Sequence, residues 1–497
     1  MVQEKNNMAR NFKIWMAEYE KWYALILFIV FSAYGILLSK HFAVDTYMTC
    51  SHEQVTPNLQ SGRWFGALIF ALLNYGFKVY AGNIQQFLTI IHIILLAAAA
   101  TVIFSTASDK IDNLCKKKVL CGIVLMSFCN VFYQELFFYS ENGLTMGIGI
   151  VLCAMAIKFC VTINDVKRSA LAFIFLSLSL GIYQAFLGIY LSWGLAIAFV
   201  NYINLRSSGM KRMWNVLLIG GAGALLNVLF LKIILKLNIA EGTDRQPSLS
   251  VQHLLNRCIE LLKAQKGIWI DTYKFLPSGL LMVVIIIAVI ALCRSRTMRN
   301  MRKLFFCTVG IQIAAVFAPH LLTDGLWLAQ RTIIGVFAVA AAILYISCME
   351  NEQAHKLIGV MCVVILGVNL VQMQRISENH FANNRLDQAN AILIEDAIEK
   401  YERENDTEIK YIAAQNDISP TWSYKGIEYV IFDTNTRAYV VDWADVELVN
   451  YYSGRQYKKV PMNETVYKNK FKDKNWDRLN TEEQLYFEGD TLYWIKY

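Results

Sequence analysis

Long apolar runs, most of them free of charged residues, occupy the first three quarters of this chain. In a lipid bilayer every backbone N–H and C=O group must be bonded within the chain, so runs of about 20 apolar residues cross it as α-helices. Only 17% of the residues are charged, against about 25% in soluble proteins. The sequence therefore predicts a polytopic α-helical membrane protein, and it excludes both an ordinary soluble enzyme and a disordered chain.

Eleven transmembrane helices account for these runs. Residues 169–205 are too many for one helix, and the polar centre at Tyr183 and Gln184 allows this run to turn and form two short spans. The expected spans are residues 22–39, 79–108, 119–134, 142–157, 169–205 (two spans), 213–231, 275–293, 304–323, 326–349 and 357–374. No small-residue cleavage site follows Leu38, so we expect the first span to be uncleaved.

The distribution of Lys and Arg gives the orientation. Positive residues concentrate in cytoplasmic loops, and every cluster falls in such a loop if the N-terminus is cytoplasmic. The clusters are Lys5, Arg10, Lys13 and Lys21; Lys110 and residues 116–118; Lys167 and Arg168; Arg206, Lys211 and Arg212; and Arg294, Arg296, Arg299, Arg302 and Lys303. An odd number of spans then places the C-terminal part outside the cytoplasm.

The C-terminal part differs in composition. Residues 375–497 carry 16 Lys and Arg against 22 Asp and Glu, whereas residues 1–374 carry 31 against 17. We therefore expect a transmembrane domain over residues 1–375 and an external α+β accessory domain over 376–497. In the accessory domain we expect an amphipathic helix at 381–405, strands at 409–413, 429–432 and 438–441, and a hairpin of 485–487 with 492–495. We assign no active site to this domain. No basic stripe with interleaved aromatic residues indicates nucleic-acid binding.

Two external loops, residues 40–83 and 237–274, are long enough to carry structure. Within the first, residues 63–73 suit a helix lying in the membrane interface, with Trp64 and Tyr75 as aromatic anchors. Within the second, residues 248–267 place Leu254, Leu261 and Leu262 at helical spacing. Two such helices would frame a site at the membrane surface. The alternative is that they only fill gaps between spans.

Soluble-enzyme signatures are missing. The sequence contains no GxxxxGK[ST] loop, no HExxH, no CxxC, no GxSxG and no Asp-x-Asp pair. Most of the 11 cysteines lie within spans, so no disulfide framework is expected, although a single Cys50–Cys258 bridge stays open. Asp45 with Glu53 or Glu135 could hold a divalent cation, but no ligand spacing supports one.

Polar residues recur in the short external turns. Ionisable groups at membrane depth are costly and often functional. The residues concerned are Glu135 and Glu141 between the third and fourth spans, Gln184 between the fifth and sixth, His320 and Asp324 between the ninth and tenth, and Arg331 just after them. The alternatives are that Glu135 and Glu141 form a wet turn and that Arg331 snorkels to the interface.

Several of these features together resemble the GtrII-type glucosyltransferase family. They are Asp45-Thr46-Tyr47 after the first span, Ser61-Gly62-Arg63-Trp64 further on, the external Tyr-Gln turns, and Phe487–Tyr493 near the end. The position after Asp45, which is acidic in many members of the family, is Thr46 here. The resemblance covers most of the chain.

The resemblance implies a GT-C type fold and transfer of a hexose, glucose by the family's label, from a polyprenyl-phosphate carrier to a hydroxyl of a surface polysaccharide such as O-antigen. It further implies a bacterial cell membrane, and a flippase and a donor-synthesising enzyme as pathway partners. Asp45 is then the candidate base for an inverting displacement, although it could also be a solvated loop acid.

The remaining candidates divide between the donor and the acceptor. Arg63 and Arg331 are candidate ligands of the donor phosphate, although Arg63 could instead anchor the interface through lipid phosphate. Glu135, Glu141, Gln184, His320 and Asp324 are candidate sugar or acceptor contacts. Two other classes stay open: a transporter or flippase of lipid-linked sugars, which should carry polar residues at mid-membrane, and a non-enzymatic envelope assembly protein.

Overall fold

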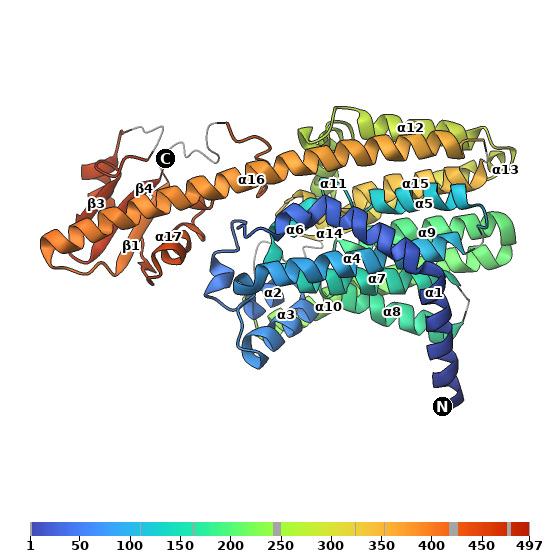
Figure 1. The fold of residues 1–497 in the computed structure, drawn as a ribbon, viewed down its shortest axis with the longest axis horizontal. Coiled ribbons are helices and arrows are strands. Elements are labelled where there is room, and N and C mark those ends of the chain that lie inside the picture. Colours follow the sequence, from blue (N-terminus) through green and yellow to red (C-terminus); the bar gives the residue numbers. More distant parts are fainter. Residues whose placement is uncertain are drawn as a thin grey trace.

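The computed structural model describes residues 2–109, 111–162, 165–241, 250–323, 325–351, 353–416, 426–474 and 479–496. It places an elongated helical bundle beside a smaller C-terminal domain, and one long helix, α16, runs along the bundle and on into that domain (Figure 1). The end of the bundle that faces the C-terminal domain is called the tail side below, and the other end the opposite side.

Eight helices of the described chain are long and apolar enough to cross a membrane. This confirms a polytopic helical membrane protein. The eight are α1 (Val2–Tyr34), which continues as a 3₁₀ turn to Leu38, α4 (Gln85–Ser108), α7 (Gly143–Thr162), α9 (Phe186–Leu205), α10 (Ser207–Lys236), α14 (Arg302–Leu322), α15 (Gly335–Glu350) and α16 (His355–Asn405).

The other three predicted spans are shorter helices. They are α5 (Leu114–Met126), α8 (Val166–Leu180) and α12 (Leu280–Cys293), with 13, 15 and 14 residues. The span predicted at 119–134 is wrong in its second half, because α5 ends at Met126, and further on the Asn130 side chain accepts bonds from the N–H groups of Phe132 and Tyr133 and so stabilises a turn before α6. The chain then forms the short helix α6 (Gln134–Phe138), which carries Glu135.

The centre of the bundle is formed by α9 and α15, whose residues are almost all buried. These helices approach closely with α14. A Cβ built on Gly335 would lie 2.8 Å from Val316 Cγ2 and 3.1 Å from the Gly188 Cα. Only glycine fits at this contact, so the start of α15, directly after Arg331, is fixed by backbone-level packing.

Both predicted interfacial helices are present on the tail side. The first is α3 (Trp64–Ala71), which follows α2 (Val55–Gln60), and the second is α11 (Val251–Gln265). Each leaves apolar side chains exposed, which in a bilayer would face lipid. These side chains are Leu68, Leu72 and Tyr75 around α3, and Val251, Leu255, Ile259 and Leu262 on α11. The short helix α13 (Arg296–Arg299) lies on the opposite side.

The C-terminal domain does not begin with a helix of its own. The helix predicted at 381–405 is the second half of α16, a 51-residue helix about 77 Å long. The boundary expected at 375/376 therefore lies within a continuous helix. A buried ion pair, Arg437 Nε to Asp387 Oδ1 at 3.8 Å, joins the rest of the domain to α16.

The described part of this domain contains a four-stranded mixed sheet of order β2-β1-β4-β3. The strands are β1 (Tyr411–Asn416), β2 (Lys458–Lys459), β3 (Leu485–Glu488) and β4 (Thr491–Lys496), with helices α17 (Asp445–Ser453) and α18 (Glu464–Val466). The predicted hairpin is β3–β4, with Gly489 at φ 59° in its turn. The strands predicted at 429–432 and 438–441 are wrong: the first region forms only a two-residue bridge between Ile431 and Thr434, and the second forms a 3₁₀ turn.

Candidate active site

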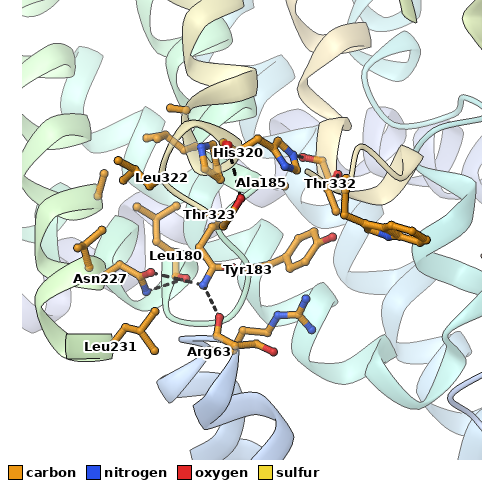
Figure 2. A pocket seen from close by; sticks show the side chains of 18 of the residues that line it. Arg63, Leu180, Tyr183, Ala185, Asn227, Leu231, His320, Leu322, Thr323 and Thr332 are labelled. Atoms are coloured by element: carbon orange, nitrogen blue, oxygen red, sulfur yellow. Dashed lines mark hydrogen bonds between the residues drawn. The ribbon is translucent and has the colours of Figure 1, made fainter. Parts of the chain in front are cut away.

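A cavity of about 220 Å³ opens among the turn before α3, helices α9 and α10, the end of α14 and the loop before α15, on the tail side of the bundle (Figure 2). It brings together four of the predicted site residues, namely Arg63, Gln184, His320 and Arg331. These residues lie far apart in the sequence. Asp324, which was predicted as a contact in the same external turn as His320, lies outside the described residues. A larger cavity, of about 410 Å³, lies at the opposite end, and none of the predicted residues lines it.

The lining of the tail-side cavity is divided by polarity. One wall is apolar, with Leu180, Leu187, Val228 and Leu231. The other carries the two arginines: Arg63 precedes α3, and its guanidinium lies 4.9 Å from the centre of the Tyr183 ring. An apolar wall facing two cations suits a ligand that has both a hydrocarbon part and an anionic group.

Gln184 and His320 form the polar floor. The Gln184 amide donates to the Ser61 carbonyl at 3.0 Å and to Asn227 Oδ1 at 3.4 Å. The Asn227 amide in turn donates to the carbonyls of Gly62 and Leu180. His320 Nε2 lies 3.4 Å from the Thr332 carbonyl. The contacts of Gln184 and Asn227 fix the turn at residues 61–63 against α8, α10 and the turn between α8 and α9, and so hold Arg63 at the cavity.

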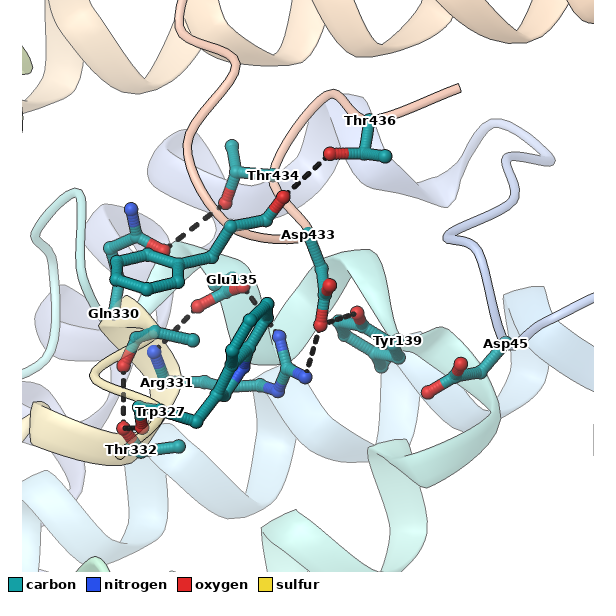
Figure 3. Close-up of polar contacts among 12 residues, drawn as sticks. Asp45, Glu135, Tyr139, Trp327, Gln330, Arg331, Thr332, Asp433, Thr434 and Thr436 are labelled. Atoms are coloured by element: carbon teal, nitrogen blue, oxygen red, sulfur yellow. Dashed lines mark hydrogen bonds and ion pairs between the residues drawn. The ribbon is translucent and has the colours of Figure 1, made fainter. Parts of the chain in front are cut away.

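Arg331 lies where the cavity meets the C-terminal domain, and it is almost fully buried (Figure 3). Its Nη1 donates to Glu135 Oε1 at 2.6 Å, and its backbone N–H donates to Glu135 Oε2 at 2.6 Å. Its Nη2 donates to Asp433 Oδ2 at 2.5 Å. The guanidinium also lies 4.4 Å from the centre of the Tyr139 ring. The interpretation of Arg331 as a snorkelling residue is therefore wrong.

Glu135 and Glu141 are both buried, so the interpretation as a wet turn is wrong as well. Burial raises the pKa of the Glu135 carboxyl, and the charge and hydrogen bonds of Arg331 act in the opposite direction. Burial likewise raises the pKa of the Tyr139 hydroxyl well above its ordinary value, again against the effect of Arg331. A buried carboxylate next to a buried guanidinium orients that guanidinium, because burial replaces the hydrogen bonds of both groups to water by bonds to each other.

Asp45, in the first external loop, does not line the cavity. It lies beyond Tyr139 as seen from Arg331 (Figure 3). Its Oδ1 accepts a hydrogen bond from the indole of Trp443 at 2.8 Å. The neighbouring Thr46 is buried, and its hydroxyl donates to Glu141 Oε2 at 3.1 Å. A second carboxylate therefore stands next to the Asp45-Thr46 pair in space, although the sequence does not place one there.

Sequence reasoning missed the contribution of the C-terminal domain. Residues 426–437, called the tail loop below, reach back to the bundle and place Asp433 on Arg331. The Tyr139 hydroxyl also donates to Asp433 Oδ2, at 3.1 Å, and Thr434 donates to Gln330 Oε1. Asp433 is one of many acids in an acid-rich segment, and nothing in the sequence distinguishes it. Tyr139 and Tyr183 did lie in the external turns that the sequence indicated.

Metal ligation finds no support among the described residues, since no three His, Cys, Asp or Glu side chains are grouped to hold an ion. Each of the 11 cysteines lies in the described part and is free, so the Cys50–Cys258 bridge is absent from this structure. His92, a buried polar residue of α4, stacks on Phe137 of α6 at a ring distance of 4.0 Å. That contact is ordinary core packing and lends no support to a transport pathway.

An apolar helical bundle with a basic, half-apolar cavity at one end defines a membrane protein with a candidate site for an amphipathic, anionic ligand. Comparison with known families makes this class specific: residues 34–349 match the family described as Glucosyl transferase GtrII. The match covers more than half of the chain, and the chain belongs to this family. It is therefore a membrane glycosyltransferase. Searches of curated proteins and of solved structures returned no match.

Proposed function

We propose that this glycosyltransferase moves a hexose from a polyprenyl-phosphate carrier to a hydroxyl of a surface glycan, at the tail side of the bundle. The observation that carries the proposal is the cavity that joins Arg63 and Arg331 to an apolar wall. A polyprenyl-phosphate sugar has the matching parts, a hydrocarbon chain and a phosphate. The exposed apolar faces of α3 and α11 border the same side and would lie in the outer leaflet.

The two arginines are assigned to the donor phosphate. A guanidinium presents a planar fork of donors that can bind two phosphate oxygens at once. The charge on the phosphate grows as the glycosidic bond breaks, and pre-placed cations stabilise that developing charge without having to reorganise. Glu135 orients Arg331 for this task, and Tyr183 supports Arg63. Gln184, His320 and Asp324 remain proposed sugar or acceptor contacts.

Asp45 is assigned as the base of a direct displacement. Its carboxylate takes the proton of the acceptor hydroxyl, the hydroxyl oxygen forms a bond to the anomeric carbon, and the bond from that carbon to the phosphate oxygen breaks. The polyprenyl phosphate leaves with the electron pair, and the anomeric configuration inverts. The bond from Trp443 supports this role, because it restricts the Asp45 carboxylate on the tail side, beyond Tyr139, where an acceptor glycan would approach. Glu141, held by Thr46, is proposed as a sugar or acceptor contact nearby.

We place the protein in a bacterial cell membrane with the tail side outside the cytoplasm. The loops on the opposite side carry the Lys and Arg clusters, which supports a cytoplasmic location for that side. The donor would then have to be made on a carrier lipid inside the cell and moved outward, so a donor-synthesising enzyme and a flippase are proposed partners.

The test compares Asp45→Asn, Glu141→Gln and Glu53→Gln in cells that carry the full chain, with surface glycan composition as the readout. Loss of the base should lower transfer by at least about 100-fold in Asp45→Asn. Glu53→Gln is the matched control, because Glu53 lies in the same external loop and caps the start of α2, where it accepts from the Val55 N–H and from the N–H and hydroxyl of Thr56.

The outcomes separate the parts of the proposal. Unchanged glycan in Asp45→Asn, with the protein present in the membrane, would refute Asp45 as base. Loss in Glu141→Gln alone would transfer that role to Glu141. A glycan that stays unchanged after deletion of the whole gene would refute transfer to that glycan.

A further inference from the structure

The tip of the tail loop is a tight two-residue turn. Ile431 and Thr434 exchange backbone hydrogen bonds at 3.2 and 3.1 Å, which leaves Phe432 and Asp433 at the tip. The Phe432 ring packs against Trp327 and Tyr273, with ring centres 5.0 and 5.7 Å apart. Asp433 reaches Arg331 beside it. The turn therefore presents one ring and one carboxylate to the cavity-side loop of the bundle.

The tail loop is held in a strained conformation. Phe432 adopts φ 54°, and Tyr429 and Asn435 have φ 60° and 55°. A positive φ is unfavourable for a bulky residue such as Phe, because its side chain crowds the backbone in that region. Strain of this kind persists only where the surroundings enforce it. Here the enforcing contacts are the aromatic packing of Phe432 and the ion pair of Asp433.

The two carboxylates on Arg331 are not equivalent. Glu135 makes two bonds, one to Nη1 and one to the backbone N–H, and its side chain is 1% exposed. Asp433 makes one bond to Nη2, its side chain is 15% exposed, and it lies on the strained turn. Of the two, Asp433 is the partner that can be exchanged. The atom that it would release, Nη2, belongs to an arginine that lines the cavity.

We propose that Asp433 is a positioning residue of the transfer reaction: it occupies Nη2 of Arg331 before the donor binds and yields that nitrogen to the donor phosphate. The inference rests on the proposed role of Arg331 in phosphate binding. A carboxylate and a phosphate oxygen make the same charge-assisted bond to a guanidinium, so they compete for it. While Asp433 is bound, it keeps the buried Arg331 charge paired. When it is displaced, the tail loop loses one of the two contacts that enforce its turn and keeps only the aromatic packing of Phe432.

The test measures binding of a polyprenyl monophosphate to the full-length protein in lipid nanodiscs, with the corresponding polyprenol as the phosphate-free probe. Asp433→Asn removes the competing charge and should tighten binding of the monophosphate about tenfold, or about 1.4 kcal/mol. Asp433→Glu keeps the charge and should bind like the unaltered protein. Glu428→Gln is the matched control, because Glu428 lies on the same loop but pairs with Arg375 at the surface.

Arg331→Gln separates this inference from the proposed function. If Arg331→Gln leaves monophosphate binding unchanged, the phosphate role of Arg331 is wrong. If Arg331→Gln weakens binding but Asp433→Asn leaves it unchanged or weakens it as well, then only the competition by Asp433 is refuted. A purely structural role of Asp433 predicts that weakening, since damage to the loop cannot improve binding of the phosphate.

A second measurement does not depend on removing Asp433. Thr434 and Gln330 are in hydrogen-bond contact, so the pair Thr434→Cys and Gln330→Cys lies within reach of a short bifunctional thiol reagent that contains a reducible disulfide, which would fix the tip in place. The locked protein should bind the monophosphate at least about tenfold more weakly than the same protein after reduction. Equal binding before and after reduction would show that the tip does not have to move, and would overturn the proposal.

Discussion

At the scale of single residues, the site depends on one buried charge and on how it is compensated. Arg331 is surrounded by Glu135, Asp433 and the ring of Tyr139. A guanidinium that is removed from water needs such partners, and the partners also determine where its donors point. Glu135 is the one that fixes the side chain against its own backbone, because it binds both Nη1 and the Arg331 N–H.

Glu135→Gln should therefore reduce sugar transfer by at least about tenfold, with the amount of membrane-inserted protein unchanged. The amide can still accept one bond, but it carries no charge and presents an NH₂ group to the guanidinium, and a bond to a charged group contributes about 1.5–3 kcal/mol. Transfer is measured as glycan modification relative to protein content. Glu260→Gln is the control, since it makes the same chemical change in a pair with Arg257 whose acid is half-exposed. Equal activity of the two variants would contradict an orienting role for Glu135.

The sequence indicated Arg331 and Glu135 separately, because each is an ionisable residue in a mostly apolar region. It could not pair them, since 196 positions separate them. It did not indicate Asp433 at all. An acid in an acid-rich external domain is usually a solubilising residue, and only the turn at the tip of the tail loop brings this one to the bundle.

At the scale of elements, α16 connects the membrane domain to the part of the chain that carries Asp433. The helix runs without a break through residues 375 and 376, and it holds the tail loop along its length. The Asn379 side chain accepts from the Glu428 N–H, the Asn383 side chain donates to the Asn435 carbonyl, and Asp387 accepts from the Ala438 N–H. The tail loop therefore depends on the straightness of α16 for its position.

Glu378→Pro should abolish or strongly reduce transfer while the bundle still inserts into the membrane. Proline removes a backbone bond and clashes with the preceding turn, at a cost of about 3 kcal/mol, and the resulting kink displaces the loop. Glu378 is exposed, so the change removes no core contact. The readouts are glycan modification and the protease resistance of the C-terminal domain, with Glu378→Ala as the control. Full activity of the proline variant would show that the loop does not need a continuous α16.

In the C-terminal domain, the bounds of an element were predictable only where the local sequence pattern alone determines the element. The β3–β4 hairpin follows from alternating apolar residues around Gly489, and the structure has it there. The strand expected at 438–441 fails because the Ala438 N–H is bonded to the Asp387 side chain rather than to a neighbouring strand. The strand expected at 429–432 fails because Tyr429 and Phe432 have positive φ values, which an extended strand does not allow. Both failures depend on contacts with elements distant in the sequence.

At the scale of the whole molecule, the positive charges of the loops and the candidate site lie at opposite ends of the bundle, and this difference between the two ends is the polarity of the molecule. The Lys and Arg clusters lie in the loops of the opposite side, and the cavity, the carboxylates and the C-terminal domain lie on the tail side. The sequence alone predicted this separation, because loop charge alternates with each span. Three of the eleven predicted spans are helices shorter than a typical membrane helix, so the alternation of loop charge is a better guide to sidedness here than the lengths of the helices.

Native cysteines allow this polarity to be tested without new sites. Cys258 on α11 and Cys115 in the first turn of α5 are both exposed and free, and they lie on the tail side and the opposite side respectively. A membrane-impermeant maleimide applied to intact cells should label Cys258 and leave Cys115 unlabelled until the membrane is permeabilised. Cys258→Ser should remove the label in intact cells, and Cys115→Ser should not. Labelling of Cys115 in intact cells, with Cys258 protected, would reverse the orientation and place the active site in the cytoplasm.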